Sequence, residues 1–341
     1  MPASAKILRA ALASLTWLLP AADYPEAEIA NREVRVKLYL PDARSGYYRA
    51  TRFDWSGIVH SLRYKGHEFF GPWFDGARPE IRDFIHEGGN IVAGPCSAVT
   101  GPAEEFSPLG WEQAKPGGNF VKIGVGTLRK PAEDRYDNFR LYEIADTGRW
   151  TVRRDRTSVE FVQDLSDSAS GYAYTYRKTV RLAGNGAGIV LEHSLKNRGS
   201  RAIATRVYNH NFLVLDRQPP GPDSVITVPF EIRSPRPPEK RLAGIRGNRI
   251  VYVKTLEGSE VARTPIEGFG GSSRDHEIRI ENSRLGVGVK ITGDRPLVNA
   301  ALWSIRTVLS VEPFIAVATR PGEEFTWTWA YEFYPLPARG R

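Results

Sequence analysis

Two short segments of the chain contain side chains that could exchange protons with a substrate. The first, residues 208–212 (YNHNF), follows an alternating apolar run and precedes a stretch rich in Pro and Gly. The second places Glu312 inside the apolar run 308–315. Histidine titrates near neutral pH, and burial would raise the pKa of Glu312 and make it a stronger base. We therefore expect His210 and Glu312 to form an acid–base pair. The alternatives are a hydrogen-bonded structural histidine and a solvated carboxylate at a strand edge.

The elements that must position these residues are strands. Apolar residues occupy every second position in many short runs, as in half-buried strands, and Gly, Pro, Asn and Asp separate the runs. No helical period of ten residues or more occurs beyond the N-terminal segment, so we predict an all-β fold, a large antiparallel β-sandwich. The predicted strands include 34–40, 158–162, 172–182, 188–195, 203–208, 250–254, 277–280, 285–291 and 325–333.

The two segments together resemble the aldose 1-epimerases, the galactose mutarotase family. The matching residues are Asn209-His210 with Phe212, then Glu312, and then the turn 321–323 (PGE) that leads into the aromatic strand 325–333. The resemblance covers roughly residues 45–335. It implies a galactose mutarotase-like supersandwich and a sugar or oligosaccharide as the ligand. No cofactor is implied.

The resemblance also implies roles for individual residues. Glu312 would remove the proton of the anomeric hydroxyl, and His210 would protonate the ring oxygen of a hexose-type sugar. Asn209 belongs to the same motif, and Asp275, which is followed by a histidine, is similar to the substrate-holding Asp of the family. Arg129 is the nearest match to its sugar-binding arginine.

Spacing in the chain suggests two further sugar-binding residues. Trp303 and Arg306 precede Glu312 closely in the chain and could stack on a sugar or bind its acidic substituent. Trp303 could equally be a core aromatic. A long loop is predicted at 103–119, in which Trp111 could form a sugar platform at the rim of a cleft. An exposed acidic loop is the alternative.

One difference from the family leaves other functions open. The family carries an additional histidine before the position of Trp150, and residues 134–149 contain none. Tyr136 or Tyr142 could replace it, whereas the His86 segment lies too early in the chain. The function is therefore either that of an aldose 1-epimerase-like isomerase or that of a non-catalytic carbohydrate-binding protein. A glycan lyase or glycosidase is a third alternative, whose second acid would be Glu104, Glu105 or Asp275.

Composition narrows the location and the partners. Residues 1–22 combine Lys6 and Arg9 with a short apolar stretch and small residues, which predicts a secretory signal. We therefore expect a single domain at 23–341 and a periplasmic or secreted protein.

The formal charge of +8 is scattered along the chain, so nucleic acid is not an expected partner. No membrane segment is expected after the signal. A single cysteine and no cluster of ligand residues argue against a metal site. The oligomeric state stays open.

Overall fold

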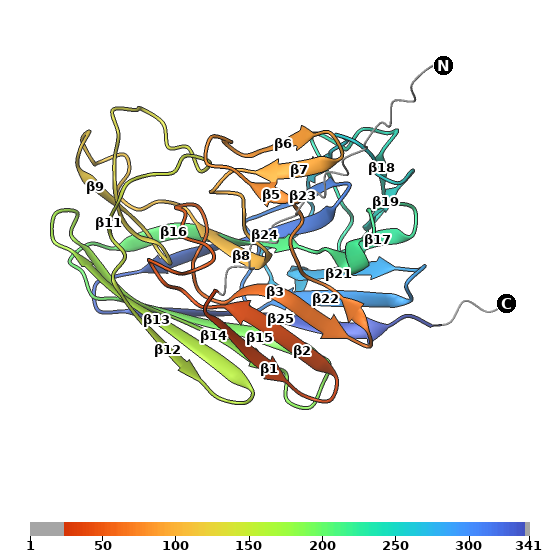
Figure 1. Ribbon diagram of the computed structural model, residues 1–341, viewed down its shortest axis with the longest axis horizontal. Helices are drawn as coiled ribbons and strands as arrows, with labels where there is room; N and C mark the ends of the chain where they lie inside the picture. Colours follow the sequence, from red (N-terminus) through yellow and green to blue (C-terminus); the bar gives the residue numbers. More distant parts are fainter. Residues whose placement is uncertain (1–23, 338–341) are drawn as a thin grey trace, which may run out of the picture.

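A computed structural model describes residues 24–337, which form two large antiparallel sheets and three small ones (Figure 1). The antiparallel β-sandwich predicted from the alternating pattern is confirmed. The secretory signal predicted at residues 1–22 lies outside the described residues. The single domain predicted at 23–341 stays a prediction.

The larger sheet has ten strands. Its central strands alternate between buried and partly exposed residues, because one face packs on the core and the other faces solvent. In spatial order the strands are β12 (Arg149–Arg154), β13 (Ser158–Asp167), β14 (Tyr172–Leu182), β15 (Gly188–Asn197), β25 (Glu324–Pro335), β22 (Val287–Gly293), β21 (Glu277–Asn282), β17 (Ser224–Thr227), β19 (Arg249–Tyr252) and β18 (Ala243–Arg246).

The second large sheet has five strands and carries the candidate site. In spatial order they are β20 (Ala262–Pro265), β23 (Asn299–Ile305), β24 (Val308–Thr319), β16 (Ile203–Phe212) and β8 (Gly101–Phe106). Gly101 opens β8 with φ +74°, and a Cβ atom there would lie 2.2 Å from the carbonyl oxygen of Val59. Only glycine fits this close approach of β8 to the neighbouring small sheet.

Three small sheets and two short 3₁₀ helices complete the described chain. The predicted long loop at 103–119 is wrong at its start, because residues 103–106 belong to β8. The small sheets are β1 (Glu26–Ala30), β2 (Val34–Tyr39), β3 (Ile58–Tyr64) and β4 (His67–Glu68); β11 (Ile144–Asp146), β10 (Gly126–Arg129) and β9 (Asn119–Lys122); and β5 (Gly76–Ala77), β7 (Asn90–Ala93) and β6 (Phe84–Glu87). The 3₁₀ helices are η1 (Leu215–Arg217) and η2 (Ser273–Asp275).

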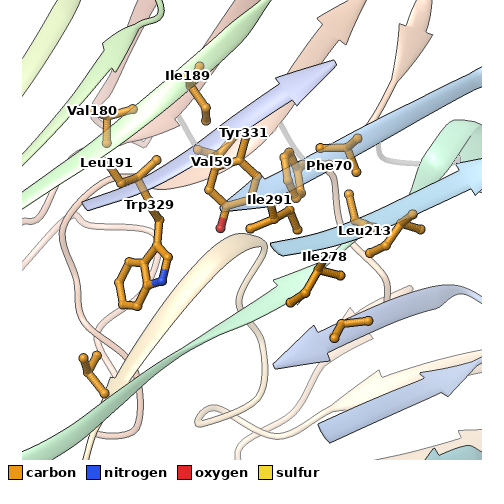
Figure 2. Close-up of a cluster of buried hydrophobic side chains, with 14 of the residues drawn as sticks. Val59, Phe70, Val180, Ile189, Leu191, Leu213, Ile278, Ile291, Trp329 and Tyr331 are labelled. Atoms are coloured by element: carbon orange, nitrogen blue, oxygen red, sulfur yellow. The ribbon is translucent and has the colours of Figure 1, made fainter. Parts of the chain in front are cut away.

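The five-stranded sheet is covered on both faces. Toward the ten-stranded sheet, Val207 of β16 and Val311 of β24 join the main core, part of which Figure 2 shows around Leu191 and Trp329. The opposite face packs against a second buried cluster, to which the N-terminal half of the chain contributes most residues and which includes Phe212. In Figure 1 the sheet of β5, β6 and β7 lies above this second face. The end of β16 is therefore buried on both sides.

Buried charges connect the two large sheets. Glu104 of β8 is completely buried and forms ion pairs with Lys178 of β14 and, at 2.7 Å, with His193 of β15. Burial alone would raise the pKa of Glu104, but its contacts with His193 and Lys178 hold it at about 2. Asp54 lies 3.6 Å from the same lysine. These acids and bases balance one another, as buried charges must.

Candidate active site

The register of two central strands sets the position of His210 and Glu312. In the β16–β24 pair Tyr208 lies opposite Phe314, and Leu213 forms a bridge with Leu309 just beyond β16. Counting between these points places His210 opposite Glu312. Because side chains alternate along a strand, both leave the sheet on the face away from the ten-stranded sheet. The sequence pattern therefore brings together two residues 102 positions apart.

The side chains of this pair lie close together and in a fixed orientation. Nε2 of His210 is 3.2 Å from Oε1 of Glu312. Nδ1 of His210 is 2.9 Å from the hydroxyl oxygen of Ser310, which can donate or accept according to the imidazole tautomer. The imidazole stacks on Phe212 with ring centres 3.6 Å apart and meets the edge of Trp303 at 5.4 Å. The ring is thus held on three sides, with Nε2 directed at the glutamate.

Burial controls the protonation of the pair. It raises the pKa of Glu312 to about 8, against the opposing charge of Arg52. Burial also holds the pKa of His210 well below its usual 6.5, and the charge of Arg52 lowers it further. At neutral pH the pair therefore holds one proton, on Glu312, beside a neutral imidazole. One proton on two facing groups gives one potential acid and one potential base.

Both residues line a cavity of about 610 Å³. This volume lies within the range of small-molecule sites in proteins. Aromatic rings form much of the wall, and three arginines and three carboxylates supply its charged groups. The wall consists of Arg52, Trp73, Asp83, Phe84, Ser97, Phe139, His210, Phe212, Arg236, Pro237, Glu239, Val261, Arg263, Thr264, Pro265, Ala301, Leu302, Trp303 and Glu312.

Arg52 is a cavity residue that the sequence reasoning missed. Its guanidinium is buried and donates from Nε to Glu105 at 2.9 Å and from Nη2 to the Tyr208 hydroxyl at 3.1 Å. Lys122 donates to the other oxygen of Glu105 at 3.2 Å. The charge of Arg52 acts on both His210 and Glu312. The sequence held no signal for it, because Arg52 lies between strands in a loop and its partners are distant in the chain.

Of the other predicted binding residues, Trp303 lies on the cavity wall. Asn209 is completely buried on the opposite face of β16, and neither atom of its side-chain amide has a hydrogen-bond partner among the described residues. Arg129 is exposed and donates to Asn119 at 2.7 Å. Alternation along β16 and the course of β10 thus direct these two side chains away from the wall.

The remaining candidates also lie off the wall. Asp275 is in η2 and accepts a hydrogen bond from the backbone of Gly270 at 2.6 Å. Arg306 donates to the carbonyl of Gly89 at 2.6 Å. Glu104 is buried among ion pairs, as is Glu105, so neither forms the exposed acidic loop considered above. The glycosidase alternative therefore loses all three acids named for it.

The remaining aromatic candidates, Tyr136, Tyr142 and Trp111, contact other protein side chains and do not line the cavity. Tyr136 accepts a hydrogen bond from Lys122 and stacks on Tyr142. Trp111 is buried against Phe120, and it is not a platform at the cavity.

Within residues 24–337 no group of three or more His, Cys, Asp or Glu could hold a metal ion. No helix in the same range is long and apolar enough to cross a membrane.

Comparisons with known proteins agree with this architecture. No family model matches the chain, and no curated protein does. A solved structure from Synechocystis is 12% identical, with coverage of 92% of this chain and 97% of its own and a TM-score of 0.54. The GalM/aldose epimerase homologue from C. elegans is 12% identical, with coverages of 92% and 100% and a TM-score of 0.52. A galactose mutarotase-like protein from Lactobacillus casei is 13% identical, with coverages of 91% and 100% and a TM-score of 0.50. The chain therefore has the galactose mutarotase-like β-sandwich fold.

Proposed function

We propose that the protein binds a hexose-type sugar in the cavity and interconverts its two anomers by acid–base chemistry. The observation that carries this proposal is the pairing of His210 and Glu312, 3.2 Å apart, on the wall of a 610 Å³ cavity. The indole of Trp303, which meets the His210 imidazole at nearly a right angle on the cavity wall, suits the apolar face of a sugar ring. The fold is also that of proteins described as galactose mutarotase-like.

The reaction needs one proton removed and one supplied. Glu312, as a carboxylate, takes the proton of the C1 hydroxyl, and His210, as an imidazolium, gives a proton to the ring oxygen. The bond between C1 and the ring oxygen breaks, and C1 becomes a carbonyl. After rotation about the C1–C2 bond, the hydroxyl formed from the ring oxygen attacks the other face of C1. Both protons then return to the groups that held them.

The resting pair already contains the proton that this cycle uses. Moving it from Glu312 to His210 across 3.2 Å creates the carboxylate and the imidazolium together. The nearby guanidinium of Arg52 favours the carboxylate form of Glu312. No proton has to enter from solvent, so the pair can act in either direction of the reaction.

Polarimetry on freshly dissolved α-aldoses tests the proposal. Glu312→Gln keeps the shape of the side chain and removes the base, and His210→Gln removes the acid. We expect each to lower the catalysed rate by about 10²-fold or more. Arg129→Gln, which changes an exposed residue away from the wall, is the matched control and should keep the wild-type rate. An unchanged rate in Glu312→Gln would remove Glu312 as the base and contradict the proposal.

Free glucose should be a poor substrate. His210 is the only histidine on the cavity wall among the described residues, so no second imidazole polarises the ring oxygen. Loss of one positioned hydrogen-bonding group commonly costs on the order of 10²–10³ in rate. A panel of larger or modified aldoses should therefore contain better substrates than glucose. Mutarotation of free glucose faster than that of every panel member would contradict this expectation.

A further inference from the structure

Two arginines on the cavity wall have no partner for their guanidinium groups within residues 24–337. Arg263 belongs to β20, and Arg236 lies in the segment between β17 and β18. Both side chains are exposed, and no ion pair or side-chain hydrogen bond involves either guanidinium in this part of the chain. Arg52, the third arginine of the wall, differs because Glu105 and Tyr208 already accept its hydrogen bonds.

Strand register places these arginines at one side of the cavity. Arg263 lies directly opposite Trp303 in the β20–β23 pair, so the two side chains share the cavity face. Ala301 lies opposite both Pro265 and Glu312, so Arg263 lies two strands from the glutamate and two residues farther along the strand direction. These offsets correspond to roughly 12 Å between the two backbones. The hydroxyl of Thr264 donates to the carbonyl of Arg236 at 3.0 Å, which holds the second arginine beside the same strand.

The acids of the wall do not cancel this charge. Glu239 already forms an ion pair with Arg241 at 2.9 Å. Asp83 accepts a hydrogen bond from Ser97 at 2.6 Å, and its nearby cations are Arg52 and Arg82. Burial raises the pKa of Glu312 to about 8, so this side chain is neutral at pH 7. The charges left without a partner on the described wall are therefore the two positive ones.

We propose that the substrate is a sugar with an anionic substituent, either a phosphate or a carboxylate, held by Arg236 and Arg263 while its anomeric carbon meets His210 and Glu312. This inference rests on the proposed function and names its substrate class. Arginine suits both anions because its planar fork can donate two parallel hydrogen bonds to their oxygens. Trp303 of β23 lies between Arg263 of β20 and the acid–base pair on β24 and β16, so a sugar ring that reaches both would lie against its indole.

Calorimetric titration compares glucose, glucose 6-phosphate, glucuronate and inorganic phosphate. We expect one or both charged sugars to bind at least 10-fold more tightly than glucose and than inorganic phosphate. A charge-assisted hydrogen bond of 1.5–3 kcal/mol corresponds to about 10- to 100-fold in affinity. Arg236→Gln with Arg263→Gln should therefore remove the preference for the charged sugar over glucose. Arg233→Gln, an exposed arginine of the same segment outside the wall, should retain the preference.

Three results would overturn the inference. They are equal affinity for glucose and both charged sugars, an unchanged preference in the double variant, and inorganic phosphate binding as tightly as the charged sugars. Preference for the phosphate or for the carboxylate identifies which anion the arginines hold. Turnover separates this inference from the proposed function. Arginine-dependent binding without any mutarotation would refute the function alone, and mutarotation of neutral sugars without charge preference would refute the inference alone.

Discussion

Replacing Glu312 by glutamine should stabilise the protein in mildly alkaline solution far more than in mild acid. In the native protein burial raises the pKa of Glu312 to about 8, from an ordinary value of 4.5. Between these pH values the native state binds more protons than the unfolded chain, so its stability falls as pH rises. Glutamine is neutral at every pH and escapes this loss.

The size of the effect follows from the two pKa values. A carboxyl group with a native pKa of about 8 and an unfolded value of 4.5 destabilises the native state by about 1 kcal/mol at pH 5.5 and about 4–5 kcal/mol at pH 8.5. The difference is about 3 kcal/mol. The side chain is 15% exposed, and contact with water reduces the cost of its charge. We therefore expect the Glu312→Gln variant to gain about 2–3 kcal/mol over wild type between pH 5.5 and pH 8.5.

Equilibrium unfolding in urea, followed by circular dichroism at both pH values, measures this gain. At pH 8.5 the urea concentration at the unfolding midpoint should be higher for the variant than for wild type. The slope of the free energy of unfolding against urea concentration should be the same for both proteins. Titration of His210 affects both proteins and largely cancels in the comparison. Glu231→Gln, at an exposed position, is the matched control and should shift the midpoint equally at the two pH values. An equal shift for Glu312→Gln at both pH values would refute the reasoning.

Three other predictions concern the same pair and its supports. The value of kcat/KM, measured by polarimetry, should stay level through neutral pH and fall above about pH 8. Above that pH the pair of Glu312 and His210 loses the one proton that it shares. Ser310→Ala removes the partner of Nδ1 and should lower kcat about 10-fold with little change in KM, while Ser310→Thr should restore most of it. Arg52→Ala leaves the buried Glu105 with Lys122 as its remaining cation, and urea unfolding should show a loss of about 2–3 kcal/mol.

Strands with one buried face could be predicted from the sequence, and β14 is an example. Its predicted range, 172–182, is the observed range, because solvent on one face enforces the alternation of apolar and polar residues. The sequence pattern did not predict β8, for the opposite reason. Both of its faces are buried, and it contains a proline and two glutamates, whose charges are balanced by residues from distant segments such as Lys178 and Arg52.

The candidate pair was accessible from sequence, but most of its surroundings were not. His210 and Glu312 come from strands whose patterns and neighbours could be recognised. Arg52, Arg236 and Arg263 have no distinguishing local pattern, and they reach the cavity only through loop conformation and the pairing of β20 with β23. Asn209 shows the converse, since its place beside the histidine in the chain puts it on the other face of the strand.

The placement of the site within the five-stranded sheet has a consequence for how the protein can diversify. The acid–base pair stands on β16 and β24, which have hydrogen-bonded neighbours on both sides, whereas Arg263 stands on β20 at the sheet edge. A substitution on β20 leaves the ladder between the two inner strands untouched. Laboratory libraries can therefore explore Arg263 and the exposed positions of 234–241 with little loss of the chemical machinery.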